Sequence, residues 1–273
     1  MAWTIEDRRR YAPAIQEMMR QGMLVRLAAT IDAIHPPSAV GRLRVWPTLV
    51  VLQALWHVAR DDRAWPRLSP RSPPHQTAGS RLSSWRRWAV LERALVVVAC
   101  RRRAAGRKHR PTVAIIATQS VKTGPQRGPR GYDANKRIKR RKRVLMIDTQ
   151  GDPLGVRVVS ADVQDRDARH ALAPDLDVHA SLLLVWLDRG FAGDDPAIFL
   201  RGYGISSELV GTAGRKGFQV EPRRWKALQT FGCLQRHRRL RVDDETSHAA
   251  SQHTAILASV FMIGMRLERM LMS

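Results

Sequence analysis

The sequence predicts an α/β fold in which helices flank a mixed sheet, with a helical region ahead of it. The chain has 273 residues, 44% of them hydrophobic, which suffices for one large domain or two smaller ones with a packed core. Up to about residue 105, apolar side chains recur at helical spacing. Beyond residue 110, short apolar runs alternate with helical segments, as in a sheet covered by helices. We therefore expect a helical region over residues 1–108, an α/β region over 109–245 and a C-terminal helical segment over 246–273.

The first region is predicted to resemble a helix-turn-helix module. Pro47 suits the first turn of one helix, and four prolines between residues 66 and 74 place a loop after it. A further helix opens near Thr77 and carries Arg86 and Arg87. A helix, a turn and an arginine-bearing helix are typical of DNA-binding modules, and such arginines more often contact phosphates than bases. The tryptophans of this helix are expected in the core rather than stacked on bases.

The α/β region is predicted to alternate strands with helices. The expected strands are Val113–Ile116, Arg143–Asp148, Leu154–Val159, Leu182–Leu187 and Ser207–Val210, with a tight turn at Gly151–Pro153. Three helices are expected. The first begins within Asp167–Leu172, and the other two cover Pro196–Arg201 and Pro222–Leu240. The amphipathic stretch Ala255–Leu271 is expected to pack on the core, although an oligomer interface is the alternative.

The charge of the chain points to a polyanionic partner. Lysine and arginine number 47 against 24 acidic residues, a net charge of +23. Such a surface repels itself unless a polyanion such as nucleic acid neutralises it. A generally basic protein from an arginine-rich proteome is the alternative, but the charge is clustered. Lysines and arginines crowd one run and its surroundings, namely Lys122, Arg127, Arg130, Lys136, Arg137, Lys139, Arg140, Arg141, Lys142 and Arg143. Arg223, Arg224, Arg236, Arg238 and Arg239 extend this basic character into the last predicted helix.

Other features limit the class of protein. Cys100 and Cys233 have no metal-ligand spacing and are expected to be buried apolar residues rather than a disulfide. No signal peptide and no run of roughly 18 apolar residues is present. We expect a soluble cytoplasmic protein.

Asp188 is the candidate metal ligand that the residues themselves indicate. It follows the apolar strand Leu182–Leu187 and precedes Gly190. A carboxylate at the end of a buried strand is held rigidly, as the ligands of two-metal phosphoryl transfer must be. An aspartate before a glycine turn is as often a turn or cap residue, so Asp188 alone does not identify a site.

Several blocks in a fixed order resemble the motifs of one family. They are Ala114–Thr123, Gly128–Asp133, Lys136–Arg143, Ala161–Asp167, Trp186–Gly193 and Pro222–Leu240, with Gly41–Arg44, Ala64–Trp65, Pro73–Pro74 and Trp85–Trp88 upstream. Together they resemble the DDE transposases of the insertion-sequence-five group of bacterial insertion elements. The resemblance covers about residues 41–240. It implies a ribonuclease-H-like core, Mg²⁺-dependent DNA cleavage and strand transfer, DNA partners (element terminal inverted repeats and target DNA) and a homo-oligomer on DNA.

The family's acidic triad is incomplete in this chain. The resemblance places the three acids at positions 117, 188 and 228, where this sequence has Ala117, Asp188 and Leu228. Neither alanine nor leucine offers a ligand atom, and Mg²⁺ usually wants one or two protein carboxylates besides phosphate. We therefore expect these three positions to form a poor Mg²⁺ site, and we expect catalysis to be lost.

Other acids are not expected to compensate. Asp148 is the nearest candidate by topology, and Glu221 lies about two helical turns before position 228. Asp162, Asp165 and Asp167 look like loop and helix-start residues.

Two classes of function remain. The first is a transposase that binds its element's inverted repeats and once cut and joined DNA. The second is an inactive DNA-binding relic, which either represses transposition or has no function. A general basic domain without transposition history is the third alternative, and the ordered motifs argue against it. Arg224 is the preferred single DNA contact, because it resembles a family position one turn before the lost glutamate.

Overall fold

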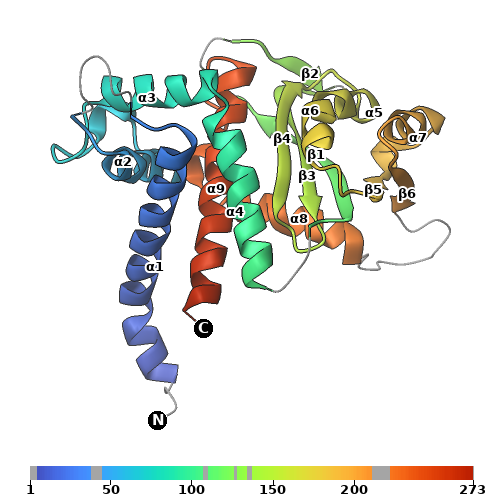
Figure 1. Cartoon of the computed structure of the whole chain (residues 1–273). Coiled ribbons are helices and arrows are strands. Elements are labelled where there is room, and N and C mark those ends of the chain that lie inside the picture. Colours follow the sequence, from blue (N-terminus) through green and yellow to red (C-terminus); the bar gives the residue numbers. More distant parts are fainter. Residues whose placement is uncertain are drawn as a thin grey trace. The chain divides into compact units, whose positions relative to one another are not determined.

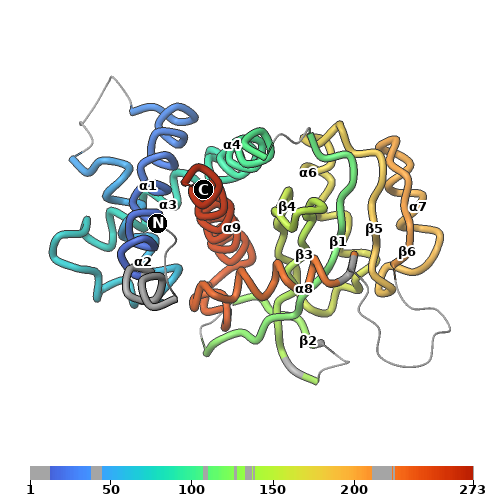
Figure 2. The backbone as a smooth tube through the Cα atoms, turned by 90° about the horizontal axis from the view of Figure 1, so that it is seen from below, coloured from blue at the N-terminus to red at the C-terminus, as the bar shows by residue number. Residues whose placement is uncertain are grey.

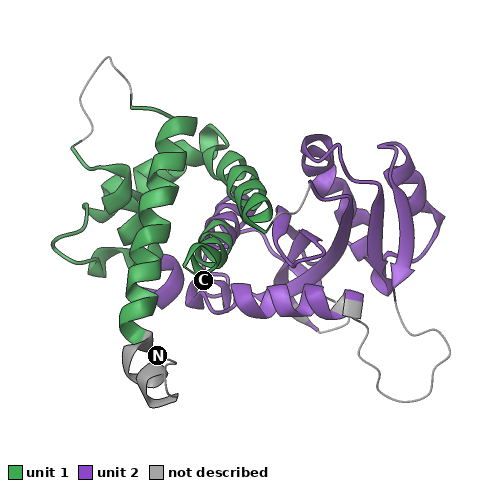
Figure 3. Cartoon of the chain, turned by 60° about the horizontal axis from the view of Figure 1, so that its bottom comes forward, with its two compact units in different colours: residues 1–57, 64–108, 260–273 green, residues 58–63, 109–259 purple. Residues whose placement is uncertain are grey.

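The computed structural model describes residues 5–37, 45–106, 110–125, 128–133, 137–210 and 222–272. The chain divides into two compact units, coloured separately in Figure 3. Unit 1 comprises Met1–His57, Ala64–Lys108 and Val260–Ser273, and unit 2 comprises Val58–Arg63 and His109–Ser259. The last helix thus contributes its first half to unit 2 and its second half to unit 1.

Unit 1 is helical, which confirms the predicted N-terminal helical region. Its helices are α1 (Ile5–Ile34), most of α2 (Thr48–Asp61), α3 (His75–Arg87), α4 (Val90–Ala105) and the second half of α9 (His248–Leu271). Figure 1 shows them in blue to green and in red. The connection between α2 and α3 contains the short helix η1 (Trp65–Arg67) and is much longer than the turn of three or four residues in a helix-turn-helix. Within the described part of the chain, no helix combines the length and apolar character needed to cross a membrane.

The side chains of unit 1 correct two predictions. Trp85 is fully buried as expected, but Trp88 is 61% exposed, because the helix ends there and Ala89 takes a left-handed conformation with φ of 48°. Cys100 is exposed and not buried, although neither Cys100 nor Cys233 forms a disulfide.

Unit 2 is built on a mixed sheet, as predicted, in which the structure describes six strands. The strands are β1 (Val113–Lys122), β2 (Gly131–Asp133), β3 (Ile138–Asp148), β4 (Pro153–Ser160), β5 (Leu184–Asp188) and β6 (Ser206–Val210). Their order is β2-β3-β1-β5-β6, with β4 also paired to β3. Antiparallel pairs join β1, β2 and β4 to β3, and parallel pairs join β5 to β1 and β6. Figure 2 shows β1 in the middle of this sheet, with β5 beside it.

The sequence located these elements well but misjudged several ends. Gly151 has φ of 78° in the predicted tight turn, and its N–H donates to the carbonyl of Asp148. The strands β1 and β3 are longer than expected, and β2 was not expected at all. The helix predicted from Asp167 is a series of short helices, α5 (Asp165–Ala168), η2 (Arg169–Leu172) and α6 (Ala173–Val178), and α7 covers Asp194–Arg201.

The last predicted helix of this region is shorter than expected. The helix α8 (Pro222–Leu234) ends six residues before Leu240, and a short helix η4 (Arg238–Leu240) follows it. A continued helix would place Arg236 beside Arg239, and Arg238 beside Arg241, three residues apart on the same surface, and such like-charge neighbours destabilise a helix.

Two layers of helices cover the sheet. On one face, Ile116, Val144, Val185 and Leu187 belong to an apolar core that includes residues of α5, α6 and α7. Because side chains alternate along a strand, Ile115, Ala117, Leu145 and Ile147 point to the opposite face. There, α8 brings Ala227 and Phe231 against β1. This arrangement places α8 over the junction of β1 and β5.

Cations of β3 anchor the segment that follows α8. Arg141 is 2% exposed; its Nη1 forms a 2.8 Å ion pair with Oδ1 of Asp243 and also donates to the carbonyl of Glu245. Arg143 donates from Nη1 to the carbonyl of Leu240 at 2.8 Å. Burial lowers the pKa of Arg143 to about 10, although Asp243 opposes this shift. These contacts attach residues 240–245 to the sheet.

Removal of the Asp243 carboxylate is expected to destabilise unit 2. Asp243→Ala leaves the buried Arg141 guanidinium without its charge partner, which costs about 3–5 kcal/mol of unfolding free energy. Urea unfolding followed by circular dichroism measures this loss. Asp244→Ala, at the half-buried next residue, is the control and should cost about 1 kcal/mol or less. Equal losses in the two variants would contradict the role of the pair.

The buried His237 predicts acid sensitivity. Burial, with Arg60 as the second cause, lowers the pKa of His237 from 6.5 to about 4, so the ring is neutral in the folded protein near neutral pH. The unfolded chain takes up a proton below its pKa of 6.5, whereas the folded chain does so only near 4. Stability is therefore fully present above pH 6.5 and falls as the pH drops toward 4, by roughly 3 kcal/mol in total.

The test of this prediction compares unfolding free energies across the pH range for the natural chain and His237→Gln. The unfolding free energy of the natural chain, minus that of His237→Gln, should fall by most of this roughly 3 kcal/mol between pH 6.5 and pH 4. Parallel pH profiles would show that His237 does not carry the effect.

Candidate functional site

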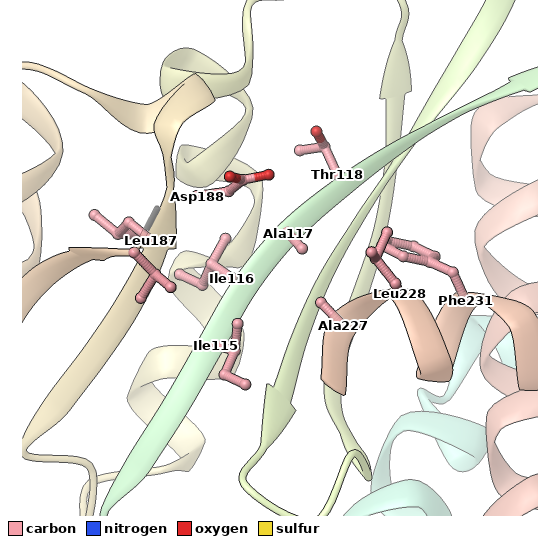
Figure 4. Close-up of a pocket in the computed structure, with 10 residues that line it drawn as sticks. Ile115, Ile116, Ala117, Thr118, Leu187, Asp188, Ala227, Leu228 and Phe231 are labelled. Atoms are coloured by element: carbon pink, nitrogen blue, oxygen red, sulfur yellow. The ribbon is translucent and has the colours of Figure 1, made fainter. Parts of the chain in front are cut away.

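The three positions singled out from the sequence meet in one pocket. The parallel register pairs Ile116 of β1 with Leu187 of β5, so Ala117 and Asp188 follow side by side. Both point to the face covered by α8, because Ile116 and Leu187 point into the core on the other face. The helix contributes Leu228, which completes the set (Figure 4). The pocket has about 400 Å³ of empty space, including its open mouth, and is lined by Ile115, Ile116, Ala117, Thr118, Leu187, Asp188, Val210, Ala227, Leu228 and Phe231.

The lining of this pocket is almost entirely apolar. Asp188 and Thr118 supply the polar side-chain atoms, and Figure 4 shows both beside Ala117 at one end of the pocket. One carboxylate oxygen of Asp188 accepts the N–H of Arg189 at 2.8 Å and caps the short helix η3 (Arg189–Phe191). Leu228 is 55% exposed at the opposite wall. Asp188 thus serves as a cap, and the described lining residues include no second carboxylate.

Asp148, the nearest alternative acid by topology, does not complete the site. Asp148 is fully buried and accepts the N–H groups of Gln150 and Asp152 in the β3–β4 turn. It pairs with Ala114, three residues along β1 from Ala117, and so faces the other side of the sheet.

The acids after β4 have local roles. Asp165 forms a 2.6 Å ion pair with Lys142, and a hydrogen bond with Ser160 is the first cause of a lowered pKa of Asp162. Asp167 is 4.0 Å from Arg169, and Glu221 lies outside the described residues. Among the residues that the structure describes, no group of three or more His, Cys, Asp or Glu side chains could hold a metal ion. The donors at the pocket therefore do not fit Mg²⁺, which needs several oxygen ligands in near-octahedral geometry.

The structure also reveals a polar cluster that sequence reasoning missed. The indole N–H of Trp186 donates to Oε2 of Glu208 at 3.0 Å. Arg223 stacks over the Trp186 ring at 4.3 Å and pairs with Oε1 of Glu208 at 2.6 Å. Arg223, expected to extend the basic surface, instead ties the start of α8 to β5 and β6. No signal in the sequence identifies this cluster, because its members are 15–37 positions apart.

The predicted basic residues fall into an exposed set and a buried set. Lys122, Arg137 and Lys139 are exposed at the ends of β1 and β3. Half-buried Arg130 and Arg140 donate to the carbonyls of Gly124 and Ser120. We call these five residues the basic strand ends.

The prediction for Arg143 is wrong. Its side chain is 2% exposed and bound to the carbonyl of Leu240, so it does not lie on a surface that DNA could contact. Arg141 and Lys142 are also buried in ion pairs. The physical reason is that β3 is paired along both edges and covered on both faces. Arg141 and Arg143 meet residues 240–245 on one face, and Lys142 meets Asp165 and the carbonyl of Val163 on the other.

The remaining predicted contacts lie elsewhere. Arg86 and Arg87 are exposed on α3 in unit 1. Lys136 and Arg127 lie outside the described residues, and Arg224 is part of α8.

Comparison with known proteins agrees with this geometry. The family model described as "Transposase DDE domain" matches residues 108–263, more than half of the chain and nearly all of unit 2. No curated protein and no solved structure matches the chain. The matched range contains all three pocket positions. It also contains the mixed sheet with flanking helices that the sequence predicted. The chain therefore belongs to the family of transposases with a DDE domain.

Proposed function

We propose that this protein is a DNA-binding transposase of the insertion-sequence-five group whose catalytic activity is lost. The observation that carries the proposal is the pocket where Ala117, Asp188 and Leu228 meet, because it keeps one carboxylate of an expected three. The family uses a divalent metal such as Mg²⁺, and carboxylates from separate elements must hold the two ions about 3.5–4 Å apart. With Asp188 as the one carboxylate and Thr118 as the other polar side chain among the described lining residues, strand cleavage and transfer lack a ligand set.

The proposed DNA partner is held by the basic strand ends. Each of the exposed cations Lys122, Arg137 and Lys139 can neutralise one phosphate and release a counterion, which makes affinity depend on salt. Arg86, Arg87, Lys136 and Arg224 are further proposed contacts. The DNA is the terminal inverted repeats of an element and its target, bound by a homo-oligomer in the nucleoid.

The proposed consequence of such binding is repression of transposition. A chain that occupies element ends, or joins an active oligomer without contributing a metal site, lowers the activity of intact transposases. Expression beside an active element of the same group should reduce its transposition frequency. An unchanged frequency, with DNA binding intact, would favour a relic without function.

Restoring the two lost carboxylates is expected to restore metal binding. Ala117→Asp with Leu228→Glu places three carboxylates around one pocket, and calorimetry should then detect saturable Mn²⁺ binding. The natural chain should show none. Adding Asp188→Asn to the double variant is the control and should abolish the binding again. Saturable metal binding by the natural chain, or Mg²⁺-dependent nicking that requires Asp188, would refute the loss of catalysis.

Neutralising the exposed basic strand ends is expected to weaken DNA binding. The triple variant Lys122→Gln, Arg137→Gln, Lys139→Gln should lower the slope of log affinity against log salt by about 2–3, at about 0.9 per phosphate contact. Fluorescence anisotropy with a labelled duplex measures this slope.

A charge-matched control separates local from general electrostatics. Arg110, Arg166 and Arg201 are exposed residues of the same unit. Their triple glutamine variant, called the control triple below, removes the same charge elsewhere and should change the slope by less than about 1. If both triple variants behave alike, the basic strand ends are not the DNA-binding surface.

A further inference from the structure

A second group of arginines lies in unit 2, just after α8. In the segment 236–241, His237 and Leu240 point inward and are buried, whereas Arg236, Arg238 and Arg241 are exposed. Arg60, from the part of α2 that belongs to unit 2, donates from Nη1 to the carbonyl of Arg236 at 2.9 Å. We call Arg60, Arg236, Arg238 and Arg241 the arginine cluster.

Like charges act on one another within this cluster. Burial is the first cause of a lowered pKa of Arg60, and Arg236 is the second; Arg238 and Arg241 act in the same direction. Asp61 opposes them. The buried His237 responds to the same positive charge, since Arg60 contributes to its lowered pKa. The cluster is therefore a place where the fold holds several cations close together at an electrostatic cost.

The nearby acids neutralise other residues. Asp62 and Glu245 both pair with Arg239, at 3.3 and 3.1 Å, and Asp243 pairs with the buried Arg141. Among the residues that the structure describes, none forms an ion pair with Arg236 or Arg238. The Nε of Arg241 donates only to the carbonyl of Gln235, at 3.2 Å. The exposed guanidinium groups thus keep donors that face solvent.

A structural role for the cluster does not account for its size. The negative end of the α8 dipole favours a cation, but the effect fades within one helical turn and is satisfied by a single side chain. Of the four arginines, Arg60 joins α2 to the segment after α8, because it donates to the carbonyl of Arg236. Three further exposed arginines add repulsion and no internal bond beyond that of Arg241. An anionic partner removes this repulsion.

We propose that the arginine cluster is a second DNA-backbone site, distinct from the basic strand ends. This inference rests on the proposed DNA-binding function and adds a contact surface to it. Guanidinium groups bind phosphate oxygens with two parallel hydrogen bonds, and a run of exposed arginines suits successive phosphates of one strand. The contacts are independent of base sequence, because they reach phosphates and not base edges.

The position of the cluster fits a strand that passes the pocket. Arg236 follows Leu228 by eight residues, and the six of them within α8 advance roughly 9 Å along the helix axis. Leu228 and the cluster thus belong to α8 and to the segment that directly follows it, so one DNA backbone is the proposed partner of both.

The test replaces the three exposed arginines together. The variant Arg236→Gln, Arg238→Gln, Arg241→Gln is compared with the control triple of Arg110, Arg166 and Arg201, which removes the same charge. Anisotropy with a duplex of arbitrary sequence, between about 50 and about 200 mM salt, should show a slope reduced by about 2–3 and an affinity reduced at least about tenfold. The control triple should change both by much less.

The outcomes separate this inference from the proposed function. A natural chain that binds no DNA overturns both. A natural chain that binds DNA, with the cluster variant and the control triple equally affected, overturns only the arginine cluster. Thermal unfolding of the cluster variant should show no loss of stability, because the substitutions remove repulsion; Arg60 is left in place because it holds the backbone of Arg236.

Discussion

The parallel pairing of β1 with β5 is the interaction on which the rest of the structure depends. Its register, Ile116 opposite Leu187, determines which two residues emerge side by side beyond the buried part of the sheet. Alternation then sends Ile116 and Leu187 into the apolar core and turns Ala117 and Asp188 toward α8. A slip of one residue would exchange these faces and bury Asp188 in that core, at a high desolvation cost. The hydrophobic pattern of the two strands therefore maintains the geometry of the pocket, whichever side chains stand at positions 117 and 188.

This protection explains how a DDE fold persists around an apolar pocket. Three carboxylates at one site repel one another unless bound cations neutralise them. Ala117 packs almost fully buried, and Leu228 places its side chain at the wall without any need for a counterion. The remaining carboxylate, Asp188, is stabilised locally by the N–H of Arg189. Packing and buried ion pairs such as Arg141 with Asp243 thus stabilise unit 2.

The lysines and arginines of the chain fall into two groups, one buried and one exposed, which the net charge does not distinguish. Arg141, Lys142 and Arg143 are part of the interior, where each finds a carboxylate or a carbonyl. The exposed arginines and lysines before β3 and after α8 have few internal partners and determine the electrostatics of the surface. Burial of cations is expensive, so the fold provides acids for the buried ones and leaves the exposed ones to solvent or to a polyanion.

The sequence by itself determined the fold class, the order of most strands and helices and the identity of the three pocket positions. These follow from apolar periodicity and from ordered motifs, which are local properties of the chain. Tertiary structure alone decided that Arg143 is inside, that Arg223 stacks on Trp186, and that Arg60 joins Arg236 across the chain. Each of these depends on contacts between residues at least 37 positions apart, and no local pattern encodes such a contact. A run of lysines and arginines has the same appearance in the sequence whether its side chains meet acids in the interior or water outside.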